Sequence, residues 1–169
     1  MPTANQFRPS DEPMDVGIGL DQDQRKPLAE GLEHILADTY LLMAKTHGFH
    51  WNVTGPEFHS LHALFEQQYT DLFGAVDEIA ERMRALGFFA PGGLGQFKEL
   101  ASLKDETDVP AAQDMLRKLA GDHDALARAC RQLIDVCDQV SDSVTEDLMN
   151  DRVAMHEKMA WMLRASMAR

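Results

Sequence analysis

The sequence predicts an all-α protein built as an antiparallel four-helix bundle, and three observations lead to that prediction. Apolar residues recur at spacings of three and four over four long segments, which is the periodicity of one helix face. No segment has the alternating pattern that is typical of a strand. One long connection occupies the middle of the chain, at residues 88–107. Together these features favour an antiparallel bundle of four helices.

The first helix is predicted from about Gln24 to about Val53, before Thr54-Gly55-Pro56 makes a turn. Residues 1–23 contain prolines and glycines and no apolar repeat, so we predict a mobile N-terminal tail there. The bundle domain is then expected to cover residues 24–169. The face of the first helix, with alternating spacings of four and three, consists of Leu32, Leu36, Thr39, Met43, Thr46 and His50.

The second helix is predicted over about residues 58–86, with an apolar stripe along one side. Gly87 is suited to end it, because glycine readily adopts the left-handed conformation that closes many helices. The connection that follows is expected to hold a short helix at about residues 96–103. The stripe consists of Leu61, Phe65, Leu72, Val76, Ile79, Met83 and Leu86.

Two further helices complete the predicted bundle. The third starts after Asp108, has a proline in its first turn, and continues to about Val140. The fourth starts near Ser143 or Thr145, because Ser143 and Glu146 have the spacing of a capping box. It runs nearly to the C-terminus.

Composition excludes several classes of protein. The 169 residues suit one domain with a buried core, and no stretch approaches the roughly 18 apolar residues of a membrane helix. The N-terminus lacks the apolar run of a secretory signal. Cys130 and Cys137 are about 10 Å apart along one helical segment, so we expect buried, reduced thiols in a cytoplasmic protein. A net charge of −12 attracts cations and repels nucleic acid.

Five side chains are candidates for metal chemistry: His50, His62, Glu66, Asp77 and Glu81. Imidazole and carboxylate are suitable ligands for iron, and also for zinc or manganese. On the second helix, with His62 at zero, the three acids lie at about 40°, about 60° and about 100°. The apolar stripe of this helix is centred about 120° away from them, so the polar side is free to face something other than the chain's own bundle.

The rigidity of a helix decides how these residues can meet. His62 and Asp77 are separated by about 22 Å along the helix, whereas metal–ligand bonds are about 2 Å long. A second copy, packed antiparallel across a two-fold axis near residues 71–73, would bring the His62 end of one helix to the Asp77 end of the other. The sequence therefore predicts two equivalent metal sites per dimer, each shared between subunits. Contacts between the copies are expected from Tyr69, Phe73 and Ala80.

Among the histidines of the chain, His50 can complete the candidate site, and those other than His50 and His62 are less informative. His50 lies at the end of the first helix face, where it can join His62, and no Glu-x-x-His pair of an in-chain di-iron site occurs anywhere in the chain. His47 and His59 each precede one of these two histidines by three residues, which leaves open a hydrogen bond to a metal ligand or an additional metal position. The other three, expected on the surface or in helix packing, are His34, His123 and His156.

The string HWNVTGPEFHSLHALFE, at residues 50–66, resembles the signature of the Dps family, the DNA-protection-during-starvation mini-ferritins. The family's second ligand pair, Asp-x-x-x-Glu on the same helix, matches Asp77 and Glu81. The resemblance covers about residues 25–168 and includes the last helix, with Lys158, Trp161 and Leu163. The positions that match the signature are His50, Trp51, Val53, Gly55, His62 and Glu66.

The resemblance implies a ferritin-like bundle that acts as a ferroxidase. Such a protein oxidises Fe(II), preferentially with hydrogen peroxide, at sites between subunits, and it stores ferric mineral in a dodecameric shell built from two-fold dimers. Removing peroxide in this way protects DNA from oxidative damage. Zinc is a further candidate to occupy the site. Acidic pores are implied near the start of the fourth helix, with Asp142, Glu146 and Asp151 as candidates.

The tail departs from the family's lysine-rich pattern. Residues 1–27 hold three positive side chains (Arg8, Arg25, Lys26) against five negative ones. A tail that binds phosphate needs the opposite balance, so direct DNA binding is doubtful. Two other functions remain as alternatives: a nucleoid-binding shell with secondary metal chemistry, which a gel shift at low salt tests, and a single-chain zinc hydrolase, which a native mass measurement tests.

Overall fold

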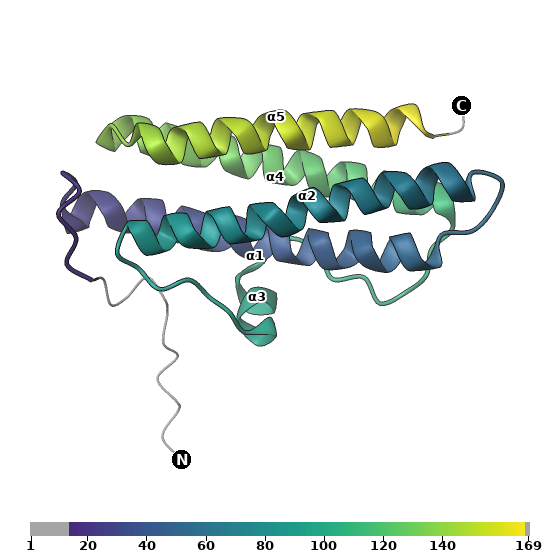
Figure 1. Ribbon diagram of the computed structural model, residues 1–169, viewed down its shortest axis with the longest axis horizontal. Coiled ribbons are helices and arrows are strands. Elements are labelled where there is room, and N and C mark those ends of the chain that lie inside the picture. The colour runs from purple at the N-terminus through teal and green to yellow at the C-terminus, as the bar shows by residue number, and fades with distance from the viewer. Residues whose placement is uncertain (1–13, 168–169) are drawn as a thin grey trace, which may run out of the picture.

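The computed structural model describes residues 14–167, and this part of the chain contains five helices and no strand. In Figure 1, α1 and α2 run antiparallel side by side, and α4 and α5 form a second antiparallel pair packed against the first. The short helix α3 lies outside the bundle, against α1. The predicted four-helix bundle with one short extra helix is therefore confirmed. The helices are α1 (Gln22–Asn52), α2 (Phe58–Ala85), α3 (Leu94–Leu100), α4 (Ala112–Val140) and α5 (Ser143–Ala165).

Helix α1 begins two residues before the predicted start because Asp21 caps it. The Asp21 carboxylate accepts a hydrogen bond from the backbone N–H of Gln24, and the Gln24 side chain accepts one from the Asp21 N–H, both at 3.0 Å. This reciprocal pair satisfies two of the donors that a helix start leaves unpaired. Of the predicted tail, residues 1–13 lie outside the described part of the chain. Met14 donates its backbone N–H to the Gly87 carbonyl at 2.6 Å.

The end of α2 is tied to the start of α1. Gly87 has a φ of +92°, and a Cβ at this position would lie 2.7 Å from the Met14 carbonyl oxygen. Both facts require glycine, because other residues rarely adopt this conformation and none would fit the space. The buried guanidinium of Arg25 donates to the Leu86 carbonyl at 2.7 Å, so it satisfies a carbonyl at the helix end.

The connection between α2 and α4 differs from its prediction in detail. Helix α3 ends at Leu100 rather than Leu103, because the N–H groups of Ser102 and Leu103 bond instead to the carboxylate of Asp38 on α1, at 2.7 and 2.8 Å. Helix α4 begins at Ala112 after its cap, so Pro110 precedes the helix and is not in its first turn. Asp38 thus holds the middle of the long connection against the bundle.

The predicted capping box of the last helix is wrong. Asp142, not Ser143, caps α5: its carboxylate accepts from the Thr145 N–H at 3.5 Å and from the Thr145 hydroxyl at 2.5 Å. The same carboxylate receives both a hydrogen bond and an ion pair from Arg82 of α2. Burial raises the pKa of Asp142, but the hydrogen bonds from Thr145 and Arg82 outweigh it and hold that pKa below its ordinary value.

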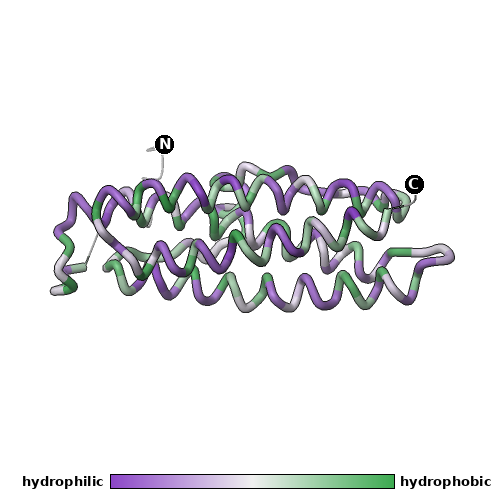
Figure 2. Tube along the Cα trace, turned by 90° about the horizontal axis from the view of Figure 1, so that it is seen from above, coloured by the Kyte–Doolittle hydropathy of each residue, from purple (hydrophilic) through white to green (hydrophobic). Residues whose placement is uncertain are grey.

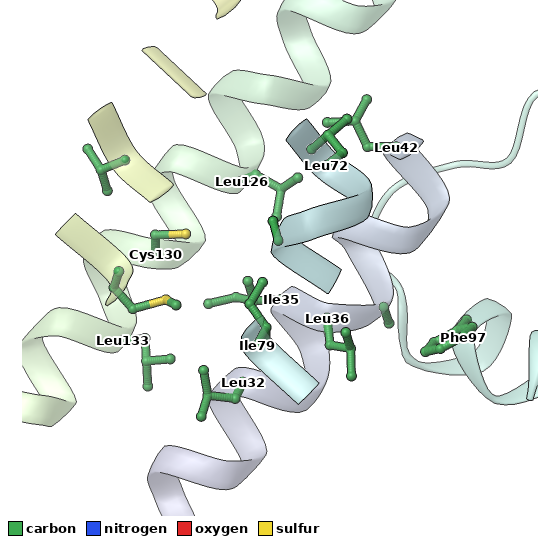
Figure 3. Packing of buried hydrophobic residues seen from close by; sticks show 14 of the residues in the cluster. Leu32, Ile35, Leu36, Leu42, Leu72, Ile79, Phe97, Leu126, Cys130 and Leu133 are labelled. Atoms are coloured by element: carbon green, nitrogen blue, oxygen red, sulfur yellow. The ribbon is translucent and has the colours of Figure 1, made fainter. Parts of the chain in front are cut away.

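Apolar side chains from the long helices fill the space between them. Hydrophobic and hydrophilic residues alternate along each long helix, as Figure 2 shows, so each has one side to bury. In Figure 3, Ile35 of α1, Ile79 of α2 and Leu126 of α4 gather in this core, and Phe97 comes from α3. Phe97 stacks on Tyr40 of α1, with ring centroids 4.4 Å apart. Between residues 14 and 167, no helix combines the length and apolar character needed to cross a membrane.

Candidate metal centre

Two histidines meet where α1 turns into α2. His50 lies in the last turn of α1 and His62 in the second turn of α2, and the short link of residues 53–57 folds one helix back on the other. Their imidazole rings stack with centroids 3.7 Å apart and planes 19° from parallel. His50 is buried and His62 is half-buried. The structure thus brings together the two imidazoles that the spacing of the sequence singled out.

Reciprocal hydrogen bonds fix the orientation of both rings. Nδ1 of His50 lies 2.9 Å from the His62 carbonyl oxygen, and Nδ1 of His62 lies 2.8 Å from the His50 carbonyl oxygen. A carbonyl oxygen only accepts, so each Nδ1 carries the proton and donates it. Each Nε2 is therefore left with a lone pair, the form of imidazole that binds a metal ion. These two backbone carbonyls therefore fix the tautomer and the orientation of both imidazole rings.

The three candidate acids all lie on α2 and are exposed. Glu66 is one turn beyond His62, whereas Asp77 and Glu81 are near the other end of the helix. None of the three carboxylates makes a hydrogen bond or an ion pair within residues 14–167. No group of three or more histidine, cysteine or acidic side chains in this part of one chain could hold a metal ion. Within one subunit, the two histidines and the two distant acids therefore stay apart.

A large apolar side chain is exposed midway along the same side of α2. Phe73 is 68% exposed, and Ala80 farther along is half-buried. Trp51, next to His50, is 65% exposed. A single exposed aromatic needs no explanation, but here the aromatics accompany carboxylates that have no partner in the described part of the chain. This side of the subunit has the composition expected of a surface that another protein chain covers.

Aromatic rings surround the two histidines. His47 stacks on Tyr69 and contacts Trp51, each at 4.2 Å between centroids. Tyr69 also meets the edge of the His50 ring at 5.2 Å. His47 is thus packed between two rings, one turn before His50, while His59 is exposed and its ring meets the edge of the Phe58 ring. The predicted extra metal position at His47 or His59 stays a prediction.

Sequence reasoning missed a second histidine pair in the core. His123 of α4 and His156 of α5 are both fully buried, with their Nδ1 atoms 2.9 Å apart. The available signal was the position of His123 in the apolar stripe of its helix, where Leu116, Leu119 and Leu126 are its neighbours. His34, by contrast, is exposed, and its Nδ1–H donates to the Leu100 carbonyl at 2.9 Å.

The pore candidates at the start of α5 separate into two kinds. Asp142 is buried, and its carboxylate accepts hydrogen bonds from Arg82 and Thr145, so it is not free to bind a passing cation. Glu146 is half-buried and Asp151 is exposed. Only these two keep the accessibility that a pore-lining acid needs.

Both cysteines are buried and unpaired on α4, as the sequence predicted. Burial raises the pKa of Cys130 to about 12. For Cys137, burial comes first and the nearby Asp142 and Glu146 add to it, again giving a pKa of about 12. The thiolate is the form that peroxide oxidises, so neither thiol competes with a metal centre for an oxidant at neutral pH.

The chain matches the ferritin-like domain family over residues 29–169, so its fold is that of a ferritin-like protein. It is 34% identical to the DNA protection during starvation protein of Porphyromonas gingivalis over 147 residues, which cover 87% of this chain and 92% of that one. A low temperature-induced protein of Nostoc sp. is 42% identical over 152 residues, covering 89% and 85%. The chain belongs to the Dps family of ferritin-like proteins.

A solved structure supports the same family. The crystal structure of a Dps protein from Vibrio cholerae superposes with a TM-score of 0.85 at 32% identity, and the match covers 92% of this chain and 98% of that one. That protein is described as a member of a superfamily of ferritin-like diiron-carboxylate proteins. The likeness therefore extends over nearly the whole described chain.

Proposed function

We propose that the protein is a ferroxidase and iron-storage protein whose metal centres are each shared by two subunits. The observation that carries the proposal is the His50–His62 pair, because both rings are held with Nδ1 protonated and Nε2 free to bind. Membership of a family that includes a diiron-carboxylate protein favours iron as the metal. Iron is here the substrate, and ferric mineral is the stored product.

A two-fold axis near residues 71–73 would complete the centre. It would place Asp77 and Glu81 of one subunit beside the histidines of the other, with Glu66 as a further ligand. The support comes from the unpaired carboxylates and from Phe73, which would lie near the axis and be covered by its own copy. Imidazole and carboxylate together suit Fe(II), and carboxylates stabilise Fe(III) after oxidation.

Peroxide is the oxidant that such a centre would use best. Each Fe(II) gives one electron, and hydrogen peroxide takes up two electrons and two protons to give two molecules of water. Two Fe(II) ions on one site therefore reduce peroxide without releasing a hydroxyl radical, which would protect DNA chemically. Zn²⁺ accepts the same ligand types but cannot be oxidised, so we expect it to inhibit by occupying the centre.

An anaerobic Fe(II) titration, followed by addition of peroxide or oxygen, tests the proposed reaction. We expect saturable Fe(II) binding, oxidation of two Fe(II) per peroxide, and a faster reaction with peroxide than with oxygen. Added Zn²⁺ should slow both reactions. If Fe(II) were oxidised no faster in the presence of the protein than in buffer alone, the proposal would be contradicted.

The shell is proposed to be a homo-dodecamer assembled from these dimers in the cytoplasm. Its native mass should then be twelve times the 18.9 kDa of the subunit. A monomeric mass would remove the shared centre and favour the single-chain zinc hydrolase instead.

Direct DNA binding is the second candidate function, because several relatives are named for DNA protection. We expect no retardation of duplex DNA in a gel-shift assay at low salt, since the net charge is −12 and acids outnumber bases in residues 1–27. Replacing Asp11, Glu12 and Asp15 with lysine reverses the charge of the tail and provides a positive control. Retardation by the unmodified protein that weakens as salt is added would support the nucleoid-binding alternative.

A further inference from the structure

The buried pair His123–His156 lies at the interface of α4 and α5, apart from the metal centre. Both side chains have no exposed surface, and their Nδ1 atoms are 2.9 Å apart. Neither Nε2 has a hydrogen-bond partner in the described part of the chain. Buried polar atoms are rarely left unpaired, so this arrangement costs stability that an apolar pair would not.

The geometry has room for one proton between the two rings. At 2.9 Å, one Nδ1 donates and the other accepts. If both rings were protonated at Nδ1, two N–H groups would point at each other, and the contact would have to open. Double protonation of the pair is therefore incompatible with the packed α4–α5 interface.

Burial first, and then the positive charge of Arg152, disfavour even the first added proton. Arg152, one turn before His156, is buried and pairs with Asp71 of α2 at 2.8 Å. From α1, Lys45 pairs with Asp122, the residue before His123 in sequence. The groups of α4 nearby are Asp124, which favours a proton on His123, and Cys130, which is neutral because of its raised pKa.

We propose that the His123–His156 pair makes the α4–α5 half of the subunit acid-labile, because burial disfavours a first added proton and the pair can hold a second one only when these two helices separate. This acid lability is a property of the fold of one subunit and does not depend on the proposed iron chemistry. If the protein forms a closed shell, as proposed above, the same opening would loosen the shell in acid.

The direction of the pKa shifts agrees with this geometry. Burial first, and then Arg152, lowers the pKa of His123 to about 3, and burial with His123 and Arg152 lowers the pKa of His156 well below 6.5. The unfolded chain binds these protons near pH 6.5, whereas the folded chain does not. The stabilisation is therefore complete above pH 6.5 and is lost progressively as the pH falls from there toward 3.

Denaturant unfolding of the assembled protein between pH 7.5 and 4, at a fixed subunit concentration, measures the effect. Below pH 6.5, each unit by which the pH falls lowers the folding equilibrium constant by about 100-fold, because unfolding takes up two protons. In His123→Asn/His156→Asn, one amide can still donate to the other, but neither titrates. We expect this double variant to lose the about 100-fold change of the folding equilibrium constant per pH unit. Each single variant should lose about tenfold of that change per pH unit, and the exposed control His34→Gln should keep the full change.

Hydrogen exchange on the wild-type protein gives a second measurement that needs no variant. After correction for intrinsic rates, peptides of α4 and α5 around the pair should exchange faster at pH 5 than at pH 7, relative to the core of α1. Equal pH slopes for wild type and the double variant would overturn the proposal. So would exchange that does not change in α4 and α5 as the pH is lowered.

Discussion

Replacing His62 with alanine is expected to slow peroxide-driven Fe(II) oxidation by at least about 100-fold. Removing even a hydrogen-bond partner of a metal ligand costs about 10–100-fold in affinity or activity, and His62→Ala removes a proposed ligand itself. The Nε2 lone pair disappears, and with it the Nδ1–H that bonds the His50 carbonyl at 2.8 Å. Stopped-flow absorbance after anaerobic Fe(II) loading measures the rate.

His59→Ala is the matched control, because His59 belongs to the same helix, is exposed, and lies with its ring against that of its neighbour Phe58. It should oxidise iron at nearly the wild-type rate. Both variants should keep the helical content and native mass of the parent. A wild-type rate in His62→Ala would show that the assigned centre is wrong, and a large loss in His59→Ala alone would move the centre to the other face of the turn.

Replacing Asp142 with alanine should destabilise the protein strongly. The Asp142 side chain is 4% exposed and that of Arg82 is 14% exposed, so the change leaves a cation largely buried without its partner. Breaking a buried pair in this way costs about 3–5 kcal/mol, and losing the N-cap of α5 adds about 1 kcal/mol. The shift in denaturant midpoint, at fixed subunit concentration, measures the sum.

Asp142→Asn separates the two contributions. Asparagine is as good an N-cap as aspartate, but it carries no charge for Arg82. The asparagine variant should therefore fall between wild type and alanine. If alanine and asparagine were both as stable as wild type, the link between α2 and α5 would have no energetic importance.

Helical periodicity predicted the bundle well because one face of each long helix is buried. The predicted start of α1 is two residues late, and the end of α3 is three residues late. The first error is local, because the start of α1 is set by the Asp21–Gln24 capping box, whereas the second arises where a contact distant in the sequence decides the outcome. Asp38 of α1 takes the N–H groups that would have prolonged α3, and Arg82 of α2 selects Asp142 over its neighbour Ser143 as the cap of α5. Local sequence patterns do not contain this information.

The candidate centre was predictable in part. Ligand spacing identified His50 and His62, which the structure places in contact, whereas the exchange of hydrogen bonds between their rings and carbonyls follows only from how the turn folds. The sequence predicts only surface or helix-packing positions for His123 and His156, because two residues 33 apart in sequence carry no sign that they will meet. Pairing between copies of the chain remains a prediction from helix length.

Mixing two inactive variants tests the shared centre most directly. His62→Ala lacks an imidazole, and Asp77→Asn/Glu81→Gln lacks the distant acids, so each alone should be inactive. When they are co-expressed in equal amounts, half of the dimers pair unlike subunits, and each such dimer has one intact centre of two. We predict recovery of about a quarter of wild-type ferroxidase activity. Activity no greater than that of the two variants measured separately would contradict a centre built from two subunits.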